Sequence, residues 1–287
     1  RQMCIRDSAE LGMPWDGVSY KISGINHMAW LLEISRNGED LYPIIRKRAQ
    51  EGPIYAPTLA LRELHPEYAD RIPSVAEQFT PDNHHDMVRF EIMKQFGYFV
   101  TESSEHSSEY YPWFIKRDHP ELIDRFHIPL DEYPRRCRDQ IARWKQQAEH
   151  LVHNENLTHT RSSEYAAGII EALETGRTFG FAGNVLNTGL IDNLPFDACV
   201  EVSCMVNEGH LSPCHMGPLP NQLAALNRRQ IEVHQLTVDA ALTRKKEYIY
   251  QAAMLDPHAG SELTIDEIRS LVDDLIQAHG DWLPEYH

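Results

Sequence analysis

Apolar and polar residues alternate in two stretches of the chain, which is the pattern of half-buried β-strands. The first stretch covers residues 17–33 and is interrupted at 24–27, where the sequence reads GINH. The second covers residues 198–207, and a short apolar run at 98–100 is also typical of a strand. One face of the second stretch holds Val200, Val202, Cys204 and Val206. We predict strands at all three places, with the polar groups of GINH at a strand edge.

Elsewhere apolar residues recur every three or four positions, which is typical of amphipathic helices. We predict one helix at 83–97 and another at 163–176, each ending at a glycine. A third begins at a capping box formed by Thr264 with Glu267 and ends at Gly280. Its apolar stripe consists of Ile265, Ile268, Leu271, Val272, Leu275 and Ile276. Because strands and helices are intermixed, we predict a mixed α/β or α+β domain.

Composition narrows the class of protein. The 287 residues, 42% of them hydrophobic and 24% charged, are enough to bury a substantial core. A formal net charge of −16 argues against an extended nucleic-acid surface, which needs clustered Lys and Arg. There is no long apolar run of the kind that spans a bilayer, and the five cysteines are an odd set without a Cys-x-x-Cys pair. We therefore expect a cytoplasmic protein with reduced thiols that binds neither nucleic acid nor membrane.

The common catalytic signatures are missing, including the nucleophile elbow, the Walker loop, the zincin helix and the dinucleotide fingerprint. Two polar clusters remain. In GINH, Gly24 would let the backbone approach a ligand closely, while Asn26 and His27 offer an amide and an imidazole. The run 101–110 contains Glu105 and Glu109, which could be the acid and base of a two-carboxylate glycosidase. From spacing alone, a structural role for His27 is as open as a functional one. For the carboxylates, a solvated face of a short helix is the commoner arrangement.

Several longer motifs are specific enough to indicate a family. They are 24–30 (GINHMAW), 37–43 (NGEDLYP), 97–106 (GYFVTESSEH), 109–110 (EY) with 112–114 (PWF), 129–134 (PLDEYP), 189–195 (GLIDNLP), 256–258 (DPH) and 280–284 (GDWLP). Together they resemble the family 4 glycoside hydrolases of the α-galactosidase type. The resemblance extends over nearly the whole chain.

Members of this family are built from a dinucleotide-binding half and a mixed α/β half similar to that of lactate and malate dehydrogenases. The resemblance implies hydrolysis of α-galactosides such as melibiose, with NAD and Mn²⁺ as cofactors. In that chemistry the sugar is oxidised at C3, a tyrosine removes the C2 proton and the aglycone is eliminated. Water then adds and the sugar is reduced again. A cation is needed because charge develops beside the C3 ketone when the C2 proton leaves.

The resemblance also implies roles for individual residues. His27 would bind the metal, Asn26 and His106 would contact the substrate, and Tyr110 would be the C2 base, with Tyr111 as the alternative. The family's second metal ligand, a cysteine upstream of this histidine, falls before Arg1. The residues that bind the dinucleotide cannot be assigned.

Domain organisation and specificity follow from the same resemblance. Residues 1–8 match nothing in the family, and 9–287 are expected to form its C-terminal catalytic and substrate domain. The chain would then lack most of the NAD-binding half and be inactive alone, and the complete enzyme would be a homo-oligomer. Acidic Glu102 and Glu105 would repel a sugar phosphate, which favours unphosphorylated galactosides. Two alternatives stay open, namely another family 4 specificity (α-glucosidase, α-glucuronidase or 6-phosphoglycosidase) and a non-catalytic remnant.

Overall fold

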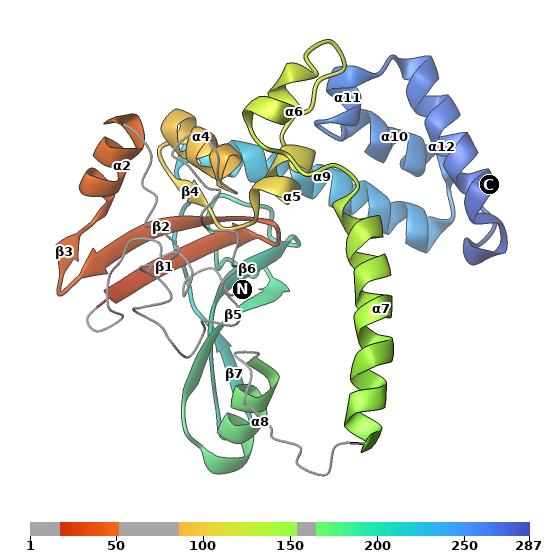
Figure 1. Cartoon of the computed structure of the whole chain (residues 1–287). Helices are drawn as coiled ribbons and strands as arrows, with labels where there is room; N and C mark the ends of the chain where they lie inside the picture. The colour runs from red at the N-terminus through yellow and green to blue at the C-terminus, as the bar shows by residue number, and fades with distance from the viewer. Residues whose placement is uncertain (1–17, 52–85, 154–164) are drawn as a thin grey trace.

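A computed structural model describes residues 18–51, 86–153 and 165–287. An antiparallel sheet with the strand order β3-β2-β1-β6-β5 lies at its centre, with β4 paired to β2 and β7 paired to β6 (Figure 1). The strands are β1 (Val18–Ile25), β2 (Met28–Arg36), β3 (Glu39–Asp40), β4 (Phe99–Val100), β5 (Phe179–Leu186), β6 (Cys199–Asn207) and β7 (His210–Pro213). With helices interspersed among these strands, the predicted mixed α/β class is confirmed.

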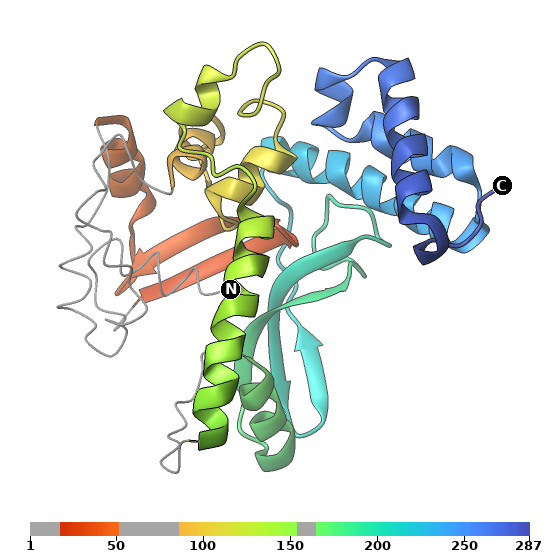
Figure 2. The ribbon, with the colours of Figure 1, turned by 45° about the vertical axis from the view of Figure 1, so that its right-hand side comes forward.

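The helices lie around the ends and sides of this sheet (Figures 1 and 2). They are α2 (Tyr42–Glu51), α4 (Met87–Phe96), α5 (Ser104–Tyr110), α6 (Glu121–Arg125), α7 (Glu132–His153), α8 (Tyr165–Thr175), α9 (Asn221–Thr243), α10 (Lys246–Leu255), α11 (Ala259–Glu262) and α12 (Ile265–His279). A 3-10 turn, Gly280–Trp282, follows the last of them. Helix α9 joins the sheet to the C-terminal group α10–α12, because it packs against both β1 and α10.

The main hydrophobic core forms where β1, β2 and β6 meet α9. Trp30, Val200 and Leu223 are among its fully buried side chains. A second cluster lies under α2 and includes Ile34 and Tyr42. No helix in the described residues is long and apolar enough to cross a bilayer.

The strand β1 folds back onto β2 as an antiparallel hairpin, with Ile25 opposite Met28 and only Asn26 and His27 in the turn. The prediction that Gly24 allows a close approach by a ligand is corrected by the structure. A Cβ atom at Gly24 would lie 2.7 Å from the Met28 carbonyl oxygen, closer than such atoms pack. The glycine is therefore required because the opposite strand, rather than a ligand, comes this close.

Most of the other predicted elements are present. In β6 the alternation is as expected, since Val200, Val202, Cys204 and Val206 are all buried. The helix predicted at 83–97 is α4, which ends at Gly97 in a left-handed conformation (φ 82°). Its predicted start at residue 83 lies outside the described residues, and so does residue 163, where the second helix was expected to begin.

The last predicted helix is α12, and its capping box between Thr264 and Glu267 is confirmed. Its apolar stripe is only partly in the core. Ile268 and Val272 are buried, whereas Ile265, Leu271 and Leu275 are exposed in the described part of the structure. The predicted helix itself is confirmed, and α10 packs against it.

Candidate functional site

The turn that carries Asn26 and His27 is anchored to the core by α9. Asn227, a fully buried residue of α9, accepts a hydrogen bond from Trp30 Nε1 (3.0 Å) and donates one to the Met28 carbonyl oxygen (2.8 Å). Both partners belong to the first residues of β2. The backbone just after the turn is thus fixed, while the side chains of the turn stay accessible.

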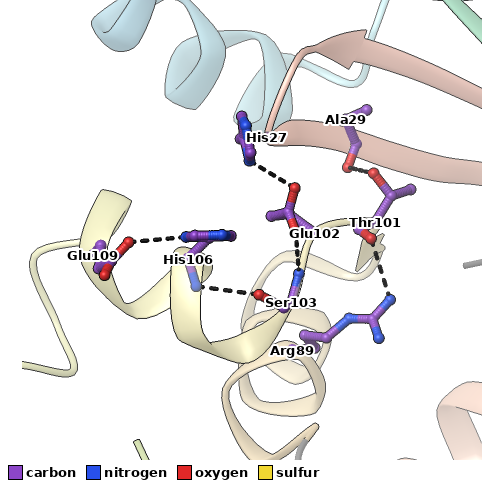
Figure 3. Close-up of polar contacts among 8 residues, drawn as sticks. All are labelled: His27, Ala29, Arg89, Thr101, Glu102, Ser103, His106 and Glu109. Carbon is purple, nitrogen blue, oxygen red and sulfur yellow. Dashed lines mark hydrogen bonds and ion pairs between the residues drawn. The ribbon is translucent and has the colours of Figure 1, made fainter. Parts of the chain in front are cut away.

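His27 is held by its backbone conformation and by a carboxylate. Its φ of 64° lies in the left-handed region, which is uncommon for a residue other than glycine and often marks a functional position. Its Nδ1 atom lies 2.6 Å from Oε2 of Glu102 (Figure 3). The side chain remains 43% exposed, so the part of the ring away from Glu102 can be reached by a ligand.

Glu102 lies in the short connection between β4 and α5, and this connection is tied to the sheet. The backbone N–H and the hydroxyl of Thr101 both donate to the Ala29 carbonyl oxygen, at 2.9 and 3.1 Å. The buried Arg89 of α4 donates to the carbonyl oxygen of Val100 at 3.2 Å. These bonds fix the position from which Glu102 reaches His27.

Helix α5 brings two further predicted residues to the same place. The rings of His27 and His106 meet edge to face with their centroids 5.3 Å apart, and the centroids of His27 and Tyr110 are 5.8 Å apart. His106 Nδ1 also lies 3.0 Å from a carboxylate oxygen of Glu109. The structure thus brings His27, His106 and Tyr110 together, with Asn26 beside them in the turn. Their individual roles stay predictions.

The two tyrosines considered as base differ in their surroundings. Burial raises the pKa of Tyr110 above its ordinary value, and the carboxylates of Glu109, Glu102 and Asp256 raise this pKa further. Tyr111 is only 1% exposed, and burial raises its pKa far more strongly. Tyr111 therefore belongs to the core, and Tyr110 is the tyrosine of this pair that a substrate can reach.

Asp256 is a residue of this region to which the sequence analysis gave no role. It precedes α11, where its Oδ1 atom accepts hydrogen bonds from the backbone N–H groups of His258 (3.0 Å) and Ala259 (2.7 Å). Its charge acts on Tyr110 although the two residues are far apart in sequence. An ion pair between Lys116 and Glu262 also joins the segment after α5 to α11. The signal that could have identified Asp256 was its place in the DPH motif.

The donor atoms at this site fit a divalent cation. One ligand atom from each of His27, Glu102 and His106 lies within 4.8 Å of the others, and in the described part of the chain these residues are the group of three that satisfies this condition. Imidazole and carboxylate together are a donor set that first-row divalent metals accept. The predicted metal ligand, His27, is thus the centre of a group able to share an ion.

A cavity of about 540 Å³ adjoins α5. Its polar lining consists of Glu105, His106, Ser108, Glu109, Asp131, Glu132, Tyr133 and Arg136. His106 belongs both to this cavity and to the cluster around His27. The lining carries four carboxylates and one guanidinium, so it disfavours a phosphorylated ligand and offers many acceptors to hydroxyl groups.

Solved glycosidases share this fold. A 6-phospho-alpha-glucosidase from gut microorganisms, solved in complex with NAD and Mn²⁺, superposes with a TM-score of 0.68 at 20% identity, covering 100% of this chain and 60% of its own. A 6-phospho-beta glucosidase from Thermotoga maritima, solved with manganese, NAD⁺ and glucose-6-phosphate, gives 0.63 at 18% identity, covering 99% of this chain and 58% of its own. At these identities the similarity establishes the fold alone.

Sequence comparison establishes the family. The model of the family 4 glycosyl hydrolase C-terminal domain matches residues 22–259, and the chain belongs to this family. The alpha-galactosidase of Bacillus subtilis (strain 168) is 54% identical over 99% of the chain, and that of Rhizobium meliloti (strain 1021) is 30% identical over 94% of it. The chain spans 60% and 51% of the lengths of these two relatives.

Proposed function

We propose that the complete protein is an α-galactosidase that uses NAD and Mn²⁺ to hydrolyse unphosphorylated α-galactosides such as melibiose. The observation that carries this proposal is the 54% identity to the Bacillus subtilis alpha-galactosidase, which extends over 99% of the chain. The acidic lining beside His106 supports the choice of an unphosphorylated substrate, because a sugar phosphate would be repelled there. Residues 9–287 would form the catalytic and substrate domain.

The proposed residue roles follow from the geometry around His27. With its ring held by Glu102 and otherwise accessible, His27 would bind Mn²⁺, which supplies Lewis-acid stabilisation of the charge that develops beside the sugar C3. Asn26 and His106 lie beside it and would donate hydrogen bonds to sugar hydroxyls. Tyr110 of α5, whose ring lies next to that of His27, would receive the C2 proton on its phenol oxygen.

Tyr110 can act as a base only when its phenol has lost its proton. Burial and three carboxylates raise its pKa, so the residues of this chain by themselves keep the phenol protonated near neutrality. A cation bound at His27 would act in the opposite direction, since a positive charge nearby favours the phenolate. The acidic surroundings of Tyr110 therefore make its activity as a base depend on the bound cation.

We further propose that the protein is a cytoplasmic homo-oligomer. The four cysteines that the structure describes, Cys137, Cys199, Cys204 and Cys214, are free thiols, in keeping with a reducing compartment. Helix α7 supports self-association, because none of its 22 residues is buried although Ile141 and Trp144 are apolar and exposed.

The test is hydrolysis of an aryl α-galactoside by the complete protein, with NAD and Mn²⁺ added and then with a chelator. We expect activity that needs both cofactors, and little activity on the 6-phosphorylated substrate. A His27→Asn variant is informative because Asn tolerates the left-handed turn, so the fold should be retained while manganese-dependent activity falls by orders of magnitude. Hydrolysis that survives the chelator would contradict the proposal and favour a two-carboxylate mechanism through Glu105 and Glu109.

A further inference from the structure

The carboxylate of Glu102 is engaged through both of its oxygen atoms. Oε1 accepts a hydrogen bond from the backbone N–H of Ser103 at 2.8 Å, and Oε2 lies 2.6 Å from Nδ1 of His27 (Figure 3). The Glu102 side chain is 21% exposed, about half as much as that of His27. The carboxylate is thus a well-fixed acceptor, and it contacts the less exposed edge of the imidazole.

This contact determines which ring nitrogen of His27 can bind a ligand. A carboxylate accepts hydrogen bonds, so the proton of a neutral His27 ring is placed on Nδ1. The lone pair is then on Nε2, at the opposite edge of the ring from Glu102. Histidines that bind metals usually donate their other N–H group to a carboxylate or a carbonyl in this way, which fixes both the tautomer and the orientation of the ring.

The position of Glu102 is itself determined by contacts that reach the core. Ser103 caps α5 by accepting a hydrogen bond from the backbone N–H of His106 (3.3 Å), and Thr101 is bonded to β2 through Ala29. Beneath them, the buried guanidinium of Arg89 bonds to the carbonyl oxygen of Thr101 at 3.5 Å. These bonds fix the backbone on both sides of Glu102, and moving its carboxylate would break the hydrogen bond from the Ser103 N–H. The carboxylate is therefore suited to hold the imidazole of His27.

We propose that Glu102 is a positioning residue, which holds the imidazole of His27 with Nε2 free and directed at the divalent cation. The proposal rests on the proposed metal-dependent function and assigns Glu102 a role in it. Although Glu102, His27 and His106 are close enough to share an ion, Glu102 acts through His27 and is not itself a ligand.

The experiment compares Mn²⁺ affinity, measured by electron paramagnetic resonance of free Mn²⁺, in the complete wild-type protein and in Glu102→Gln and Glu102→Ala. Loss of an outer-shell carboxylate typically weakens metal binding 10- to 100-fold, so we expect about a 10-fold loss with Gln and about a 100-fold loss with Ala. Glu102→Asp keeps the charge and should recover part of the affinity. The ligand-field spectrum of bound Co²⁺ should keep its shape in all three variants, since the ligands themselves are unchanged.

The matched control is Glu121→Gln. Glu121 pairs with Nδ1 of His119 at 3.0 Å, the same kind of contact, on an exposed surface away from the site. The Mn²⁺ affinity of the Glu121→Gln variant should equal that of the wild type. Circular dichroism and thermal unfolding of each variant separate a loss of metal affinity from a loss of fold.

Two results would overturn the positioning role. Wild-type Mn²⁺ affinity in a folded Glu102→Ala protein would mean that the contact does not matter, and an altered Co²⁺ spectrum in that variant would mean that Glu102 is a direct ligand. Both differ from a failure of the proposed function, which would appear as a wild-type protein that hydrolyses no α-galactoside whether or not Mn²⁺ is present.

Discussion

At the scale of single residues, Tyr110 is the group whose surroundings matter most for the proposed chemistry. It lies next to Tyr111 in sequence, yet Tyr111 is sealed in the core while Tyr110 is only partly buried and contacts the ring of His27. Its role as a base and its pKa can both be tested by substitution.

A Tyr110→Phe variant should lose the ability to exchange the substrate's C2 proton with solvent deuterium. Phenylalanine keeps the ring contact with His27 at 5.8 Å but has no oxygen to accept the proton. Mass spectrometry of substrate recovered from deuterated buffer measures the exchange, and Mn²⁺ affinity serves as the control for an intact site. Exchange at the wild-type rate would assign the base to another residue.

A Glu109→Gln variant should shift the acid limb of the pH-rate profile to lower pH. The negative charge of Glu109 raises the pKa of Tyr110, so its removal lowers that pKa and a larger fraction of the phenolate is present at any pH below it. The profile of kcat/KM against pH, measured with saturating NAD and Mn²⁺, checks this. A shift to higher pH would mean that the limb reports a different group.

At the scale of elements, the β1–β2 hairpin depends on α9. Asn227 satisfies the indole N–H of Trp30 and the carbonyl oxygen of Met28, and both groups are buried. Removing one side of a buried hydrogen bond leaves its partner unsatisfied, at a cost of about 1–3 kcal/mol for each group. The helix thus contributes to the position of His27 through the residues that follow the turn.

We expect Asn227→Ala to destabilise the protein by roughly 2–5 kcal/mol, because two buried polar groups lose their partner. Urea unfolding followed by circular dichroism measures the change. Asn221→Ala, at the exposed start of the same helix, is the matched control and should change stability by well under 1 kcal/mol. Equal stability of the two variants would show that the hairpin does not depend on these bonds.

At the scale of the whole molecule, α7 is distinct from the other helices. In Figure 1, α7 is the long yellow-green helix that extends away from the other helices. Its exposed apolar side chains include Ile141, Trp144, Leu151 and Val152. An amphipathic helix with this much exposed apolar surface is expected to be covered in the assembled protein.

A Trp144→Glu substitution should therefore lower the oligomeric state of the complete protein, because it places a charge in the middle of this surface. Light scattering coupled to size-exclusion chromatography gives the mass of the wild type and of the variant. Arg143→Glu is the control, since it changes charge by at least as much at a neighbouring position whose side chain points elsewhere. A wild-type protein that is already a monomer at micromolar concentration would contradict the proposal of self-association.

The local features of this protein follow from short stretches of its sequence. Alternation fixed the buried face of β6, glycine marked the end of α4, and the capping box began α12, because each depends on residues within a few positions of one another. The family motifs also identified the residues that meet at the site. The pattern did not show how much of the apolar stripe of α12 is buried, since burial depends on which elements pack against the helix.

The groups that surround His27 come from elements that are far apart in the sequence and meet through the packing of the fold. Asn227 bonds Met28 across 199 positions of sequence, and Glu102 reaches His27 from a different element, so neither contact follows from spacing. The pKa of Tyr110 is likewise set by burial and by Asp256 from the C-terminal helices. Electrostatic and hydrogen-bond contacts act over a few ångströms in space, and separation along the chain does not limit them once the sheet and α9 have packed together.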